Sequence, residues 1–312
     1  MIGRHPDVGM IGRRTFLGAA ATAAALAATG CTGGGPPLIR LAAGEVGGFY
    51  HAFSLLLAAA AADAGTLRIQ PVTTTGSVAN LDLLTRGDAE AALTLTDTVA
   101  DRPDHLLAIG RVYENYLQLA VGADSDLHTV ADLRGTRISL GAPGSGATFT
   151  GERILRIAGL EPGTDLTVTH LPLQDAVTAI ATGTADALLW AGGVPTTVLD
   201  VPHTLRLLDL GDFAGALHDR YGYYYDLVVI AADTYPGAPA IRTIGVANLL
   251  VTTADLPAAT AAALTELLLT HADRLVPTEA TGTQFLDIRS LIATSDLPLH
   301  PGAARVYRRH HG

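Results

Sequence analysis

The fold is decided by residues 38–64, which read LIRLAAGEVGGFYHAFSLLLAAAAADA. Leu38–Ala43 predicts a buried strand, the glycine-rich stretch after it predicts a turn, and Phe49–Ala64 has the length and apolar density of a helix. Alternating strands and helices predict a parallel sheet, with ligands bound beyond the carboxyl ends of its strands. The order continues with a strand over Leu67–Thr73, Ser77 as the expected N-cap of a helix over Val78–Arg86, and a strand over Ala91–Leu95.

A second series of the same kind occupies the middle of the chain. Its strands and helices are predicted over Thr136–Leu140, Ala147–Ala158, Leu166–His170, Asp175–Ala181 and Ala185–Trp190. Two α/β units joined by extended crossings predict a two-lobed protein with a ligand cleft between the lobes. Outside the two series, we expect strands over Leu117–Val121 and Thr243–Thr252, a helix over Leu256–Val276 and a frayed tail over Arg308–Gly312.

Composition narrows the classes of function. The chain has 312 residues, of which 48% are hydrophobic and 16% charged, so it can form a sizeable core. The formal net charge is −10. The first 31 residues have a net charge of +2, so the remaining residues have a net charge of −12. Nucleic acid is not an expected partner, because its phosphates need a basic surface.

Residues 1–31 have the features of an export signal that ends in a lipid attachment site. Arg13-Arg14-Thr15-Phe16-Leu17 is a twin-arginine signature, and Ala28-Thr29-Gly30-Cys31 resembles a lipoprotein cleavage box. Cys31 is the only cysteine in the chain, so we interpret it as the acylated residue. The apolar run over residues 18–28 is too short for a bilayer span, which needs about 20 residues. We expect a lipoprotein exported by the twin-arginine route and anchored at the outer face of the cell membrane, with residues 32–37 as a tether.

Three glycine-rich turns at strand ends carry the candidate ligand-binding residues. Each precedes a predicted helix, whose first N–H groups and dipole suit a carboxylate or phosphate. Each could also be a plain turn, with Ser77 or Asn80 capping its own helix. Trp190, beside Gly192-Gly193, is compatible with the cleft or with the core. The three turns are Gly47-Gly48-Phe49-Tyr50, Thr75-Gly76-Ser77-Val78-Ala79-Asn80 and Ala142-Pro143-Gly144-Ser145-Gly146-Ala147-Thr148.

Motifs for catalysis and metal binding are missing from the sequence. It lacks the nucleophile elbow, the dinucleotide-binding glycine motif, the zinc-binding His-Glu-x-x-His and Cys-x-x-Cys spacings, and any lysine for a P-loop. Asp97, Asp175 and Asp186 have no spacing that implies an acid/base pair, and a metal on His310-His311 would be incidental. We therefore expect neither an enzyme nor a resident metal or cofactor.

Taken in order, the turn motifs resemble the TAXI family, the extracytoplasmic solute receptors of TRAP transporters. The resemblance covers about residues 41–307 and includes Gly47-Gly48-Phe49-Tyr50, Gly76-Ser77-Val78-Ala79-Asn80-Leu81, Asp132-Leu133-Arg134-Gly135, Gly141–Gly146, Gly193-Val194-Pro195-Thr196, Thr234-Tyr235-Pro236-Gly237 and Pro298–Ala304. It implies a type II periplasmic-binding-protein fold that closes over a small carboxylate, such as glutamate, glutamine, or a keto or dicarboxylic acid. It also implies delivery of that ligand to a TRAP membrane permease.

The resemblance implies a division of the chain and a set of ligand-binding residues. Residues 38–118 and 244–312 would form lobe one, and residues 119–243 would form lobe two. The ligand would be bound by Gly48, Tyr50, Ser77 and Asn80 from lobe one and by Gly144, Ser145, Gly146, Ala147, Trp190, Gly193 and Pro195 from lobe two.

The sequence departs from the family at Glu45, where a small or hydroxyl residue is usual. His51 and Leu95 also replace an aromatic residue and a glutamine of the family pattern. Glu45 could face the ligand, where it would repel a carboxylate or bind an amino group. It could also point to solvent as a charge in the first turn of a helix, which is the placement we slightly favour. An orphan ligand-sensing lipoprotein that signals through a membrane partner is the alternative function.

Overall fold

The computed structural model of the chain describes residues 1–3, 35–102, 105–201, 204–222, 224–277 and 286–311. Pro36–Gly312 forms a compact unit of its own. The predicted twin-arginine signature, cleavage box and Cys31 lie at residues 4–34, outside the described residues. The account below concerns Pro36–Gly312.

In the part of the chain that the structure describes, ten strands form a single mixed sheet. Its strand order is β2-β1-β3-β10-β4-β7-β5-β6, with β8 added beside β4 and β9 beside β10. Pairing is parallel among β1, β2 and β3 and among β5, β6 and β7, and antiparallel around β4 and β10. The parallel pairing predicted for the strand–helix series is therefore confirmed within β1–β3 and within β5–β7, and the strands outside the series, β4 and β10, pair antiparallel. The strands are β1 Leu38–Ala42, β2 Arg68–Val72, β3 Ala91–Leu95, β4 Leu106–Gly122, β5 Arg137–Ser139, β6 Thr167–Thr169, β7 Ala187–Gly192, β8 Leu205–Leu207, β9 Tyr225–Ile230 and β10 Ile241–Thr253.

Most of the helices follow strand ends, as the sequence predicts. The described α-helices are α2 Phe49–Ala64, α3 Ser77–Thr85, α4 Thr96–Ala100, α5 Gly146–Ile157, α6 Leu173–Ala181, α7 Ala214–Tyr221, α8 Ala258–Thr270, α9 Ile288–Leu291 and α10 Pro301–His311. Two expectations were wrong. The helix predicted over Leu256–Val276 is α8, which ends at Thr270. Arg308–His311 belong to α10 rather than to a frayed tail. Tyr307 anchors α10, because its hydroxyl donates to the carbonyl of Ile109 over 2.9 Å.

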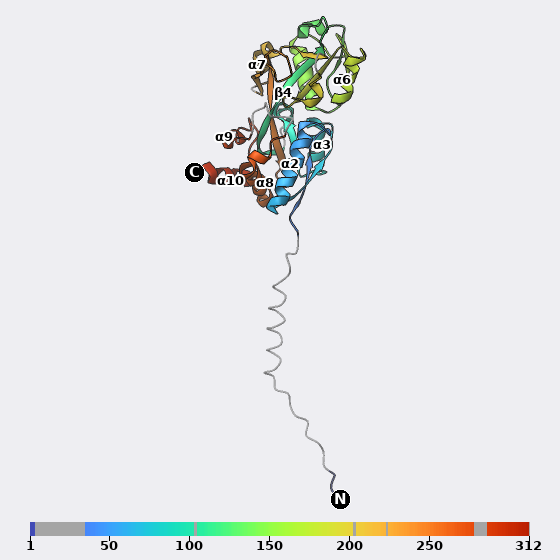
Figure 1. The fold of residues 1–312 in the computed structure, drawn as a ribbon. Coiled ribbons are helices and arrows are strands. Elements are labelled where there is room, and N and C mark those ends of the chain that lie inside the picture. The colour runs from blue at the N-terminus through green and yellow to red at the C-terminus, as the bar shows by residue number, and fades with distance from the viewer. Residues whose placement is uncertain (4–34, 103–104, 202–203, 223, 278–285, 312) are drawn as a thin grey trace. The chain divides into compact units, whose positions relative to one another are not determined.

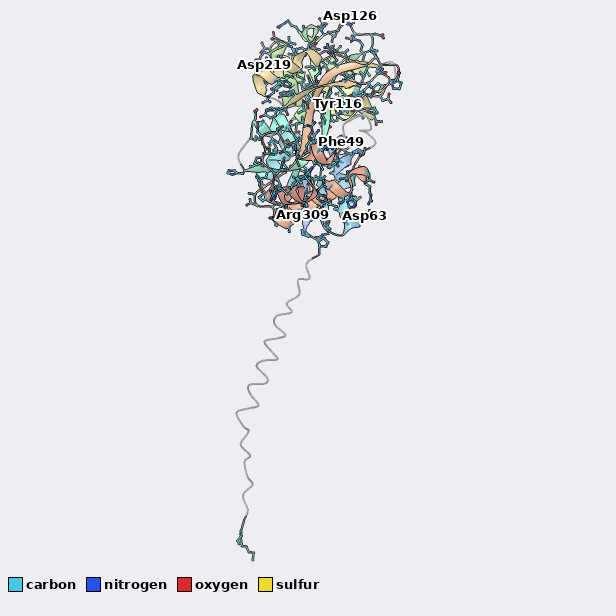
Figure 2. All side chains as sticks on the ribbon, turned by 90° about the vertical axis from the view of Figure 1, so that its left-hand side faces the viewer. Phe49, Asp63, Tyr116, Asp126, Asp219 and Arg309 are labelled. Carbon is cyan, nitrogen blue, oxygen red and sulfur yellow. The ribbon has the colours of Figure 1, made fainter. Side chains whose placement is uncertain are left out.

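Two long strands connect the two ends of the sheet. Along β4, residues 106–116 pair with β10, whereas residues 116–121 pair with β7. Figure 1 shows β4 running from the elements around α2 and α3 to those around α6 and α7. In Figure 2, Tyr116 lies between Asp126 and Asp219 at one end and Asp63 and Arg309 at the other. We call β1–β3 with α2 and α3 the first half of the sheet, and β5–β7 with α5 and α6 the second half.

Each half has its own hydrophobic core. In the first half, Phe53, Leu57 and Leu93 belong to a buried cluster that also includes residues of α8 and α10. In the second half, Ile138, Ile154 and Leu189 belong to a separate buried cluster under α5. Burial of such side chains stabilises the fold by about 1.5–3 kcal/mol each. Among the described residues, no helix combines the length and the apolar character needed to cross a membrane.

Candidate functional site

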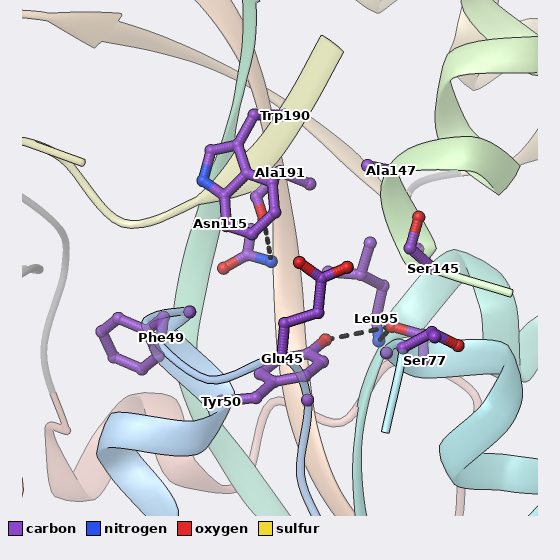
Figure 3. A pocket seen from close by; sticks show the side chains of 15 residues that line it. Glu45, Phe49, Tyr50, Ser77, Leu95, Asn115, Ser145, Ala147, Trp190 and Ala191 are labelled. Atoms are coloured by element: carbon purple, nitrogen blue, oxygen red, sulfur yellow. Dashed lines mark hydrogen bonds between the residues drawn. The ribbon is translucent and has the colours of Figure 1, made fainter. Parts of the chain in front are cut away.

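The turns that follow β1, β2 and β5 converge on one cavity of about 50 Å³. The ends of β3 and β7 complete its wall, so the cavity lies at the carboxyl ends of strands from both halves of the sheet, where α/β proteins bind ligands (Figure 3). It is lined by Gly44, Glu45, Gly48, Phe49, Tyr50, Thr75, Gly76, Ser77, Leu95, Asn115, Ser145, Gly146, Ala147, Trp190 and Ala191.

The structure brings together seven of the eleven predicted site residues in this cavity. They are Gly48, Tyr50, Ser77, Ser145, Gly146, Ala147 and Trp190. Asn80, Gly144, Gly193 and Pro195 are not among its lining residues.

Asn80 holds the first half of the sheet together. It is fully buried, and its side-chain amide donates to the carbonyls of Ala43 and Leu93 while its oxygen accepts from Thr74. Every polar group of the Asn80 side chain is therefore used within the protein, between the ends of β1 and β3. This is the bonding of a structural asparagine, which leaves a ligand nothing to pair with.

Two of the other three residues, Gly144 and Gly193, also make internal hydrogen bonds. The Gly144 carbonyl accepts from the N–H groups of Val78 and Ala79, over 3.0 and 3.3 Å, and so occupies the start of α3. The Gly193 carbonyl accepts from Gln118 and Thr196. Pro195 follows a cis peptide bond beside that turn.

Tyr50 and Ser77 form a hydrogen-bonded wall of the cavity. The Tyr50 hydroxyl donates to Asn248 and lies 3.1 Å from the Ser77 hydroxyl. Burial raises the pKa of Tyr50 far above its usual value, so the phenol stays neutral. Ser77 is not the N-cap that the sequence predicts. It is the first residue of α3, and its oxygen accepts from the backbone N–H of Leu95 over 3.1 Å.

The start of α5 presents unpartnered N–H groups to the cavity. Ser145 caps this twelve-residue helix by accepting from the N–H of Thr148 over 3.2 Å. Within the described part of the chain, no acceptor pairs with the N–H groups of Gly146 and Ala147. Free amides at a helix start bind anionic oxygens, because the helix dipole adds to their hydrogen bonds.

Glu45 lies in the wall of the cavity, half-buried, and not in solvent as the favoured expectation had it. Figure 3 shows its carboxylate projecting between the side chains of Asn115 and Leu95. Burial raises its pKa, the backbone N–H of Leu173 at the start of α6 partly offsets this, and the nearby Asp175 raises the pKa further. The cavity thus has a carboxylate of its own.

Two buried polar atoms that belong to lining residues have no hydrogen-bond partner within the described part of the chain. They are Oδ1 of Asn115, whose residue is 4% exposed, and Nε1 of Trp190. Nδ2 of Asn115 donates to the carbonyl of Ala191, which fixes the orientation of the amide. Leaving such buried groups unpaired costs about 1–3 kcal/mol each, so a bound molecule is expected to satisfy them. Sequence reasoning missed Asn115, although an asparagine in an apolar strand is a signal.

Two of the three carboxylates singled out in the sequence make structural contacts. Asp97 is buried and accepts from Thr150 over 2.7 Å and from Tyr225 over 3.2 Å, and burial raises its pKa. Asp186 forms an ion pair with Arg137. No group of metal-ligating side chains suited to an ion occurs among the described residues.

Comparison with protein families assigns the chain. The profile of the NMT1-like family matches residues 41–310, which is most of the chain and includes every residue that lines the cavity. The chain belongs to the NMT1-like family.

Solved structures similar to this NMT1-like protein share its fold at low sequence identity. A protein of Bordetella bronchiseptica RB50 is 15% identical, with 88% of this chain and 98% of that chain covered and a TM-score of 0.57. A mutant of ArgBP from T. maritima is 11% identical, with 77% and 92% covered and a TM-score of 0.51. The substrate binding protein of an amino acid ABC transporter is 12% identical, with 76% and 95% covered and a TM-score of 0.50. The α/β fold expected from the sequence, that of periplasmic binding proteins, is confirmed.

Proposed function

We propose that this NMT1-like protein is an extracytoplasmic solute receptor of a TRAP-type transporter. It captures a small carboxylate and delivers it to a membrane permease. The observation that carries the proposal is the start of α5, where the N–H groups of Gly146 and Ala147 face the cavity without acceptors in the described chain. Each charge-assisted hydrogen bond to such a group is worth about 1.5–3 kcal/mol, so a few can support micromolar binding, near −8 kcal/mol.

Capture proceeds by closure of two lobes, residues 38–118 with 244–312 and residues 119–243. The two main hydrophobic clusters support this division, because most of each lobe can then move as a packed body about β4 and β10, with Leu95 of β3 as a lobe-one residue that packs in the second cluster. Tyr50 and Ser77 line the cavity from lobe one, and Ser145, Gly146 and Ala147 line it from lobe two. The two sets lie against each other in the structure, where the Gly144 carbonyl accepts from the N–H groups of Val78 and Ala79, and separation of the lobes would open the cavity to a ligand.

An ABC permease is a second candidate partner, because one protein of this fold is the substrate binding protein of an amino acid ABC transporter. Uptake assays distinguish the two. A TRAP permease loses uptake when the ion gradients are collapsed, and an ABC permease loses it when ATP is depleted. Uptake without this receptor would instead favour the orphan ligand-sensing lipoprotein.

Calorimetric titration of the full chain tests the carboxylate. The panel is glutamate, glutamine, 2-oxoglutarate, succinate and arginine, and micromolar binding of at least one acid is expected. Ala147→Asp should weaken that binding at least tenfold relative to Ala147→Asn, because the two side chains match in size and only aspartate repels a carboxylate at the start of α5. Equal affinities of the two variants would exclude this end of the cavity as the anion site.

A further inference from the structure

Glu45 gives the cavity a negative charge that no cationic side chain among the described lining residues neutralises. No arginine or histidine is among the described lining residues, and the sequence has no lysine. Among the described residues, Glu45 takes part in no ion pair. The titratable group that faces it from α6 is Asp175, of the same sign, and the backbone N–H of Leu173 is the one favourable contact from that element.

The two ends of the cavity differ in polarity. Glu45, in the turn before α2, supplies an acceptor with negative charge, whereas the start of α5 supplies N–H donors and the positive end of a helix dipole. The buried Oδ1 of Asn115 is a second acceptor and the buried Nε1 of Trp190 is a further donor, both without partners in the described chain. A molecule that satisfies this set has to donate at one place and accept at another.

We infer that Glu45 is a specificity-determining residue that binds a protonated amine, an inference that rests on the proposed function. The ligand is then a small zwitterion, with its carboxylate at the start of α5 and its ammonium group at Glu45. A keto acid of the same carbon skeleton would bring a carbonyl oxygen to the Glu45 carboxylate, where two acceptors repel. An ammonium group supplies both the donor and the counter-charge that a half-buried carboxylate requires.

A purely structural role for Glu45 predicts a different pattern. If Glu45 only ties the turn before α2 to the N–H of Leu173, then a neutral acceptor of the same size would serve as well, and every ligand would be affected alike. Glu45→Gln keeps the acceptor and removes the charge, and Glu45→Ala removes both. The two variants therefore separate charge recognition from positioning.

The experiment measures the affinity of the full chain for two matched pairs, glutamate with 2-oxoglutarate and alanine with pyruvate, by calorimetry. The wild-type protein is expected to bind the amino acid of at least one pair at least tenfold more tightly than its keto acid. Glu45→Gln should abolish this preference by weakening amino acid binding, with keto acid binding unchanged or improved. Glu161→Gln, at an exposed glutamate remote from the cavity, is the control for net charge.

Three results would overturn the inference. The first is tighter binding of the keto acids than of the amino acids by the wild-type protein. The second is a preference for the amino acid that survives in Glu45→Gln but is lost in Glu45→Ala, together with keto acid binding. Both would leave the proposed carboxylate receptor standing. Absence of binding for all four compounds and for succinate would overturn the proposed carboxylate receptor itself, and this inference with it.

Discussion

At the scale of single residues, the pKa of Glu114, which lies outside the cavity, is strongly shifted by its surroundings. Glu114 is 3% exposed on β4, and it lies against Gly245, where even a Cβ atom would come 2.3 Å from its carboxylate. The absence of a side chain at Gly245 lets Glu114 reach Asp226 on β9, and Arg111 lies 3.5 Å away. Burial, with Asp226 nearby, raises the pKa of Glu114 to about 7, and Arg111 offsets only part of the effect.

This shift predicts how stability changes with pH. Between pH 4.5 and 7 the folded protein keeps a proton on Glu114 that the unfolded chain has lost, so the free energy of unfolding falls as pH rises through this range. Glu114→Gln removes this titration, so the loss in the free energy of unfolding between pH 4.5 and 7 should be smaller by about 1–3 kcal/mol than in the wild-type protein. Urea denaturation at half-unit steps from pH 4.5 to 7.5 measures it, with Glu161→Gln as the control. Parallel pH profiles for Glu114→Gln and the wild-type protein would contradict the assignment.

At the scale of elements, the first turn of α5 packs against the end of β3 with no space to spare. A Cβ atom on Gly146 would lie 2.5 Å from Cδ1 of Leu95 and 2.8 Å from the Ser77 hydroxyl. Gly146 does not need a positive φ, so alanine suits the helix itself. Glycine is required here because the two halves of the sheet approach each other at this point.

Gly146→Ala should therefore push the halves apart without harming α5. Overpacking of this kind costs about 1–3 kcal/mol, and we expect a lower melting temperature together with faster amide hydrogen exchange in residues 141–147 and 75–80. Leu95→Ala in the same chain should restore both properties by making room for the added methyl group. If the double variant is no better than the sum of the two single variants, the contact between α5 and β3 is not the cause.

How much could be predicted from the sequence also depends on the element. α2 and β3 were predicted to the residue, because a long apolar helix and an apolar strand between turns need no distant partner to be recognised. The first part of β4, α7, β9 and α10 were missed. α10 is rich in arginine and histidine, and it is held by the Tyr307 hydroxyl and by contacts of Arg309 and His310 with Glu266 on α8, which only the tertiary fold supplies.

The cavity shows the same limit. Glycines and hydroxyls at strand ends could be predicted to gather there, because the order of strands and helices in the sequence fixes which ends share an edge of the sheet. Whether a side chain faces the cavity or the protein could not be predicted. Asn80 turned to the carbonyls of Ala43 and Leu93, while Glu45 turned inward.

At the scale of the whole molecule, the export signal predicts where the receptor works. Acylated Cys31 would hold the protein at the membrane, because each buried CH₂ of an acyl chain contributes about 0.8 kcal/mol and two or more chains give stable anchoring. Cys31→Ser keeps the twin-arginine signature and removes the thiol that the lipid needs. We expect the variant to be exported and to move from the membrane fraction to the soluble extracytoplasmic fraction, with loss of radiolabelled palmitate. Cys31→Ala should behave identically, because the thioether bond and not residue size is at stake.

Both variants should bind the receptor's ligand as the wild-type protein does, since Cys31 lies outside the NMT1-like region, residues 41–310, that contains the cavity. Persistence of either variant in washed membranes would show that something other than Cys31 anchors the chain.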